Sequence, residues 1–118
     1  MVEIDIAVAI DKALSDYSEE VQEKLDKCVE EAAKYGAERL KTVSASKGWK
    51  NYSKSWGIKK DGSSRIIKSS KGQLTHLLEF GHALRQGGRT RAFTHIKPVE
   101  DEVNKKLEND VKKVIEQI

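Results

Sequence analysis

Three histidines and one glutamate are the side chains whose types could do metal chemistry. His76, Glu79 and His82 lie close together in the chain, and His95 follows them. Two histidines can share a zinc ion on one helix face when they are four residues apart. His76 and His82 are six residues apart, which places them about 120° apart around a helix axis. The spacing argues against a metallohydrolase, and we expect these histidines to hydrogen-bond backbone groups at a helix end or a subunit contact.

The serines and glycines could supply a nucleophile or a phosphate-binding loop. The serines lie in turn-like contexts without the pattern of a nucleophile elbow. The glycines from Gly81 to Gly88 match neither the P-loop nor the dinucleotide-binding spacing. Cys28 is the only cysteine, so it forms no disulfide within one chain, and its apolar neighbours predict a small core residue. We therefore expect no catalytic residue, no metal and no cofactor.

Aromatic and basic residues interleave in the middle of the chain. The aromatic residues are Trp49, Tyr52 and Trp56, and the lysines among them are Lys47, Lys50, Lys54 and Lys59. This composition suits a surface that stacks bases and holds phosphates. It equally suits an amphipathic strand whose aromatic side chains are core, and a chain with only 6% aromatic residues favours the core. The glycine-rich basic segment from Gly87 to Arg91 is expected to be flexible and to order on a partner.

The basic residues are concentrated in the middle of the sequence. From Lys41 to Lys97 thirteen lysines and arginines face only Asp61 and Glu79, a net charge of +11. Because the whole chain carries +3, the remaining residues carry −8. Such a distribution fits a plain solvated surface, a surface for an anionic partner such as nucleic acid, or oppositely charged faces that let copies or unlike proteins stack. The candidate contacts with a partner or DNA are Lys47, Lys50, Lys54, Arg85, Arg89 and Arg91.

The strongest periodic pattern predicts a long helix from Glu19 to Val43. Apolar or small residues recur there at steps of three and four, Ser18 suits the N-cap, and acidic residues follow it. Gly36 weakens a helix, which suggests that another element crosses closely at that point. The apolar residues between Ile6 and Leu14 predict a shorter helix before it, and the stretch from Ser15 to Ser18 predicts the break.

The residues after Val43 predict strands and two more helices. Asp61-Gly62, between Trp56–Ile58 and Arg65–Ile67, is typical of a hairpin of two antiparallel strands. The leucines at 74, 77 and 78 predict a short helix that ends at Gly81 in a left-handed conformation. We expect a mobile loop over residues 85–90 and a third strand over residues 91–96. Pro98 fits the first turn of a final helix, followed by acidic residues at 100–102; its expected buried stripe is Val99, Val103, Leu107, Val111, Val114 and Ile118.

This order of elements predicts an α+β fold, in which a small antiparallel sheet packs with a long N-terminal helix, a short middle helix and a C-terminal helix. The 118 residues suit one domain over residues 1–118, with a small aliphatic core that neighbouring subunits would help to stabilise. No apolar run approaches the length of a membrane span, and the first residues include Glu3 and Asp5, unlike a signal peptide. We expect a soluble cytoplasmic protein without membrane contact.

The run from Gln73 to Ala83, followed by Gly87-Gly88-Arg89 and by His95-Ile96-Lys97-Pro98, resembles the gene-ten-type tail-component family of long-tailed bacteriophages. The resemblance extends to the charged helix ending near Leu40, to the segment from Tyr52 to Trp56 and to the final helix. The chain has Gly72-Gln73 where the family usually has an aromatic residue and an arginine, and Thr94 where it usually has a proline.

The resemblance implies a structural virion protein of a phage or prophage, made in the host bacterial cytoplasm, whose copies form a ring in the neck where the head joins the tail. Its partners would be other copies of itself, head-closure or connector proteins and tail proteins, with transient passage of phage DNA. A tail terminator is the close alternative, and a basic nucleic-acid-binding module is a second one. The resemblance gives assembly or structural roles to Leu74, Thr75, His76, Leu77, Leu78, Glu79, Gly81, His82, Gly87, Gly88, His95 and Pro98. It also implies that the three leucines anchor the short helix and that His76, Glu79 and His82 fix backbone or subunit geometry.

Overall fold

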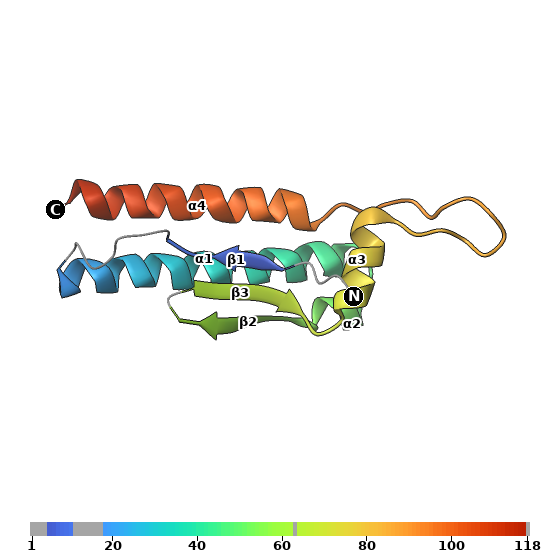
Figure 1. The fold of residues 1–118 in the computed structure, drawn as a ribbon, viewed down its shortest axis with the longest axis horizontal. Helices are drawn as coiled ribbons and strands as arrows, with labels where there is room; N and C mark the ends of the chain where they lie inside the picture. Colours follow the sequence, from blue (N-terminus) through green and yellow to red (C-terminus); the bar gives the residue numbers. More distant parts are fainter. Residues whose placement is uncertain (1–4, 11–17, 63, 118) are drawn as a thin grey trace.

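The computed structural model describes residues 5–10, 18–62 and 64–117. The molecule is elongated, with extents of 60 × 27 × 20 Å, because two long helices run antiparallel along its length (Figure 1). These helices are α1 (Glu19–Ser46) and α4 (Ile96–Glu116), which pack against each other. The other elements are β1 (Ile6–Val8), α2 (Lys50–Ser53), β2 (Trp56–Asp61), β3 (Ser64–Ser69) and α3 (Gly72–Phe80). This arrangement confirms the expected α+β fold with its long N-terminal, short middle and C-terminal helices.

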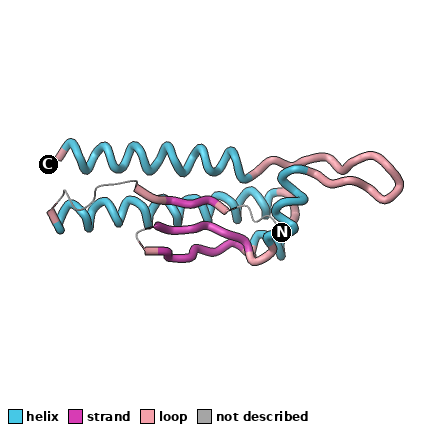
Figure 2. Tube along the Cα trace, in the orientation of Figure 1, coloured by secondary structure: helices cyan, strands magenta, loops and turns pink. Residues whose placement is uncertain are grey.

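The three strands form one antiparallel sheet in the order β1-β3-β2, which packs against α1. Ile67 in the central strand pairs with Ile6 on one side and with Ile58 on the other. The expected hairpin is confirmed, with Gly62 in its turn at a φ of 60°. Figure 2 shows the strands in magenta beside the long helices, in a sheet too small to cover their full length.

The predicted helix over residues 6–14 is wrong at its beginning. Ile6 and Val8 are fully buried while Ala7 between them is exposed, which is the two-residue alternation of a strand. A short apolar segment fits a helical and a strand period almost equally well, and pairing with β3 decides between them. The rest of that prediction, Ala13 and Leu14, and the predicted break over 15–17 lie outside the described residues.

The predicted third strand over residues 91–96 is also wrong. Residues 91–95 form an irregular segment, and Ile96 is the first residue of α4. The sheet's third strand is β1, and both edges of the central strand β3 are taken by β1 and β2. The backbone N–H groups of Phe93 and His95 instead donate to the Leu78 carbonyl oxygen and to the Glu79 carboxylate, so they do not pair with a strand.

The core lies where α1, α4 and the sheet meet. The buried residues that fill it include Leu25, Cys28, Val29, Ala32, Ala33, Ala37, Leu40, Ile67, Val99, Val103 and Leu107. A methyl group added at Gly36 would lie 2.5 Å from Ile67 Cδ1 and 2.6 Å from Val103 Cγ2, so glycine here lets both the sheet and α4 approach α1. The expected close crossing at Gly36 is confirmed. Cys28 is buried as predicted, and burial raises the pKa of its thiol.

The ends of the long helices match their predicted signals in part. The side chain of Ser18 caps α1 by accepting a hydrogen bond from the Val21 backbone N–H at 3.3 Å. Pro98 lies in the first turn of α4, and Val111 and Val114 are partly buried against the core, whereas Ile118 lies outside the described residues. The acidic residues 100–102 lie beyond that first turn, which contains no acidic residue. No helix in the described part of the chain is long and apolar enough to cross a membrane.

Candidate functional site

The residues of the 74–98 motif gather at one end of the molecule. They form α3, an extended hairpin-like arm over residues 81–95, and the first turn of α4. The arm projects beyond the rest of the chain along the long axis (Figure 1, yellow to orange). The described structure therefore brings the two halves of the motif together at the base of this arm.

Glu79 is the residue that joins α3 to α4. Its carboxylate is buried, with only 6% of the residue exposed. Glu79 Oε1 accepts hydrogen bonds from the backbone N–H groups of His95 at 2.7 Å and Ile96 at 2.9 Å, and Oε2 accepts one from Lys97 at 3.3 Å. The first N–H groups of a helix lack partners within the helix and carry its positive dipole end. A carboxylate of α3 thus accepts hydrogen bonds from the N–H groups at the start of α4.

His95 continues this buried network toward the sheet. Its Nδ1 lies 3.0 Å from Glu79 Oε1 and 2.8 Å from the Phe93 carbonyl oxygen. Because both neighbours are acceptors, Nδ1 carries a proton. Its Nε2 lies 2.9 Å from the Tyr52 hydroxyl, which donates to Thr75 Oγ1 at 2.8 Å. The network therefore links α2, α3 and the start of α4.

Tyr52 occupies the middle of that network. Burial raises the pKa of its phenol to about 12, the hydrogen bond to Thr75 opposes this rise, and the Glu79 carboxylate adds to it. The Tyr52 ring packs edge-on against Trp56 at 5.5 Å and against His95 at 5.7 Å between centroids. Tyr52 and Trp56 are almost fully buried and Trp49 is partly buried, so the core interpretation of the aromatic residues is confirmed.

A second set of contacts fixes the base of the arm. Gly81 has a φ of 72°, and a Cβ there would lie 2.6 Å from the Thr90 carbonyl oxygen. Its ψ of 176° is extended, so the residue has the expected positive φ without the full left-handed helical conformation. The His82 backbone N–H donates to Thr90 Oγ1 at 2.9 Å, and the Thr90 N–H donates to the His82 carbonyl at 2.8 Å. These bonds hold the two strands of the arm together where they leave the body.

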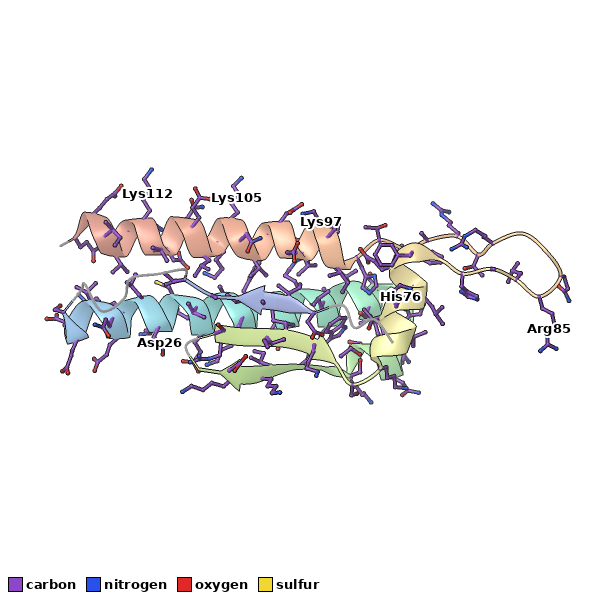
Figure 3. All side chains as sticks on the ribbon, in the orientation of Figure 1. Asp26, His76, Arg85, Lys97, Lys105 and Lys112 are labelled. Atoms are coloured by element: carbon purple, nitrogen blue, oxygen red, sulfur yellow. The ribbon has the colours of Figure 1, made fainter. Side chains whose placement is uncertain are left out.

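The outer part of the arm has few contacts of its own. Ala83 and Arg89 form a single antiparallel bridge, and the Leu84 N–H donates to the Gly88 carbonyl at 2.9 Å. Gly87 and Gly88 both have positive φ values, at 98° and 79°, which explains the pair of glycines at the turn. Arg85 lies at the tip and points away from the body (Figure 3).

The implied anchoring role of the α3 leucines holds only for part of the set. Leu78 packs against the core, whereas Leu74 is 39% exposed. The prediction that Leu74 anchors the helix is therefore wrong. Thr75 and Glu79 are the fully buried residues on the inner face of α3. The helix is thus held chiefly by polar bonds. His76 Nδ1 is buried without a hydrogen-bond partner among the described residues, and the His76 ring lies 5.2 Å from the ring of the exposed Phe80.

The candidate partner-contacting cations are all exposed. Lys47 and Arg91 flank a hollow of about 260 Å³ that is also lined by Trp49, Phe93 and His95. Lys47 Nζ lies 5.7 Å from the Phe93 ring centre and the Arg91 guanidinium 6.0 Å from it. Between Lys47 and Arg91, the cations that form no ion pair with any described residue are Lys47, Lys50, Lys54, Lys59, Lys60, Lys71, Arg85, Arg89 and Arg91.

The buried polar side chains of this junction hydrogen-bond to one another and to backbone groups. In the described residues no three histidine, cysteine or acidic side chains are grouped as metal ligands. Sequence reasoning missed Tyr52 and Thr90 as members of this site. For Tyr52 a signal was available, because a tyrosine hydroxyl needs a hydrogen-bond partner when it is buried. Nothing in the sequence indicated Thr90.

The model of the family described as "Bacteriophage HK97-gp10, putative tail-component" matches residues 9–81, more than half of the chain. The match runs through α1, β2, β3 and α3 and ends at Gly81, so the arm and α4 lie beyond it. No curated protein and no solved structure matches the chain.

Proposed function

The chain belongs to the bacteriophage HK97 gp10 tail-component family, and from this premise we propose that its copies assemble into a ring at the head-tail interface of a phage or prophage virion. In this role it completes the neck or the tail end, contacts head-closure or connector proteins and tail proteins, and lets phage DNA pass. The single observation that carries the proposal is the family match over residues 9–81.

Two features of the structure support a role in assembly. The arm is fixed at its base by Glu79, His95 and Thr90, while its outer part extends away from the chain's own core. The core itself is small and mostly aliphatic, and a domain of this size gains stability when neighbours cover its surface.

A role without catalysis is part of the proposal. The buried titratable side chains of the junction, Glu79, Tyr52 and His95, bond to one another or to backbone groups. A general acid or base must instead present its proton to a substrate. These groups instead hold α3, α2 and α4 together, which supports a role without catalysis.

A tail terminator is a second candidate, since a small ring-forming α+β protein suits either position. A nucleic-acid-binding role is favoured by one observation, the set of exposed cations without ion-pair partners on α2, β2 and the arm. Binding to DNA would then weaken steeply as salt rises, because phosphate contacts release counterions.

The test is electron microscopy of a lysate in which this gene alone carries an early stop codon. Separate DNA-filled heads and tails of normal length are expected if the protein joins them. Tails of uncontrolled length would assign the terminator role instead. Intact infectious virions would overturn both roles, and binding of purified protein to DNA at low salt would then decide the nucleic-acid alternative.

A further inference from the structure

The arm is the part of the described chain with the least support from its own molecule. It extends past α3 and the start of α4, with nothing of the body on either side of its tip (Figure 1). Leu84 is 43% exposed on it, and its outer half has a single bridge. An isolated two-stranded hairpin is marginally stable in water, so a surface that covers the arm would stabilise it.

The arm is also purely cationic. Residues 81–95 contain Arg85, Arg89 and Arg91 and no acidic residue. Arg85 and Arg89 form no ion pair with a described residue, whereas Arg91 lies over the Phe93 ring. The two outer arginines therefore have a charge that the described part of the chain leaves unbalanced.

The opposite end of the molecule has a matching acidic stripe, which we define as Glu19, Glu23 and Asp26. Their spacings of four and three residues place them on one face of α1. Together with Gln22 they line a shallow groove. Glu19 and Glu23 form no ion pair with a described residue, and Asp26 pairs with Arg65 at 3.4 Å. The exposed Ile115 of α4 is at this same end, where α1 begins and α4 finishes.

We propose that the arm of one subunit docks along the acidic stripe of a second copy of this chain, with Arg85 and Arg89 meeting Glu19 and Glu23. The proposal rests on the ring assembly proposed above and names its contact. Arm and stripe lie at opposite ends of an elongated molecule, so one chain cannot pair its own arm with its own stripe. The contact is heterologous, and such contacts repeat from subunit to subunit until a ring closes.

The observations favour a protein partner over a nucleic acid for this surface. The tip places an exposed leucine beside its arginines, and the aromatic ring nearest to them, Phe93, already lies against Arg91 and Lys47. Base stacking needs a free aromatic face. The chain itself offers two carboxylates on the stripe without an ion pair to a described residue, Glu19 and Glu23, which is the complement that two arginines require.

The test is a charge exchange between arm and stripe in the full chain, followed by sedimentation velocity at low and high salt. The arm variant is Arg85→Glu with Arg89→Glu, and the stripe variant is Glu19→Lys with Glu23→Lys. We expect the wild-type chain to self-associate and each variant alone to associate about tenfold more weakly or worse, because like charges then face each other. An equimolar mixture of the two variants restores assembly, since each arm again meets a stripe of opposite charge.

The matched control is Lys59→Glu with Lys60→Glu, an exposed pair on β2 whose charge change equals that of the arm variant. This control should assemble as the wild type does, and circular dichroism should show every variant folded, because all the positions are exposed.

Arm and stripe variants that assemble like wild type would overturn this contact while leaving the ring intact. Variants that fail separately and also fail when mixed would overturn the pairing of arm with stripe. An arm variant that assembles normally but loses binding to duplex DNA would assign the arm to nucleic acid instead. A wild-type chain that stays monomeric would overturn the ring assembly itself.

Discussion

The α1–α4 helix pair and the motif end around α3 are stabilised in opposite ways. The helix pair buries aliphatic side chains and a glycine contact, and it places most of its charges on its surface. The basic residues there that form ion pairs with acids of the same two helices are Lys24, Lys34, Arg39, Lys41, Lys97 and Lys106. The motif end instead buries polar groups and leaves its exposed cations unpaired. The two regions therefore differ in what they bury: the helix pair buries apolar side chains, whereas the motif end buries a carboxylate and its hydrogen-bond partners.

The largest expected effect is at the buried carboxylate of the motif end. Glu79→Ala leaves the N–H groups of His95, Ile96 and Lys97 without their acceptor and removes the negative charge beside the His95 ring. We expect the free energy of unfolding to fall by about 3–5 kcal/mol, measured by urea denaturation. Glu108→Ala, at an exposed position on α4, is the control and should change stability by less than about 0.5 kcal/mol. Equal losses for both variants would show that the two regions do not differ as described.

The next effect is a pH dependence that the buried phenol of Tyr52 gives to the motif end. The pKa of Tyr52 is raised to about 12 by burial, so the folded chain keeps this proton to higher pH than the unfolded chain does. The stabilisation is complete below pH ~10 and is lost as pH rises through about 12, a loss of about 3 kcal/mol. Tyr52→Phe lacks this proton. Urea unfolding at a series of pH values should therefore show the stability gap between wild type and variant shrinking over that interval, and a constant gap would contradict it.

A smaller effect is expected from a larger side chain at Gly36, where the helix pair packs closely. Gly36→Ala places a methyl group against Ile67 and Val103, and the overpacking outweighs the better helix propensity of alanine. We expect a net loss of about 1–2 kcal/mol in thermal or urea unfolding. Gly57→Ala, where an added Cβ meets nothing within 4 Å, should be nearly neutral. A stabilised Gly36 variant would mean that α1 and α4 can separate at this crossing without cost.

The smallest effect is expected from the surface charges of the helix pair. Lys34→Ala removes an ion pair with Glu30 at 3.9 Å in which both side chains are at least half exposed. Solvent screens such pairs, so stability should change by less than about 0.5 kcal/mol in urea denaturation. A larger loss would remove the distinction between surface charges here and buried charges at Glu79.

Periodic features of the fold were predictable from the sequence, and relations between distant residues were not. The long helix with its Ser18 cap, the hairpin at Asp61-Gly62 and the close approach at Gly36 follow from local patterns. The strand at Ile6 depended on pairing with Ile67, 61 residues away in the chain, and no local pattern indicates such a partner. The sequence predicted that the acidic residues after Pro98 would interact with the positive end of the α4 dipole. Glu79 supplies this negative charge instead, from another helix.

The candidate site was predictable to a similar extent. The resemblance marked Glu79, Gly81, His82 and His95, and the structure brings them together at the base of the arm. It did not indicate that Tyr52 links His95 to Thr75, because a side-chain hydrogen bond depends on the packing of three separate elements. Leu74 followed the helical period of a buried position yet is exposed, since α3 packs little of its surface on the rest of the chain.

The position of Glu79 between the two ends of the arm has a mechanical consequence. The arm leaves the body at Gly81 and returns at His95, and the Glu79 carboxylate is bonded to the returning end. A displacement of the base of the arm therefore moves the start of α4 as well, because the peptide chain and the Glu79 carboxylate both join them. Since α4 is about 31 Å long, a small tilt at its start becomes a larger shift at its other end, near the start of α1.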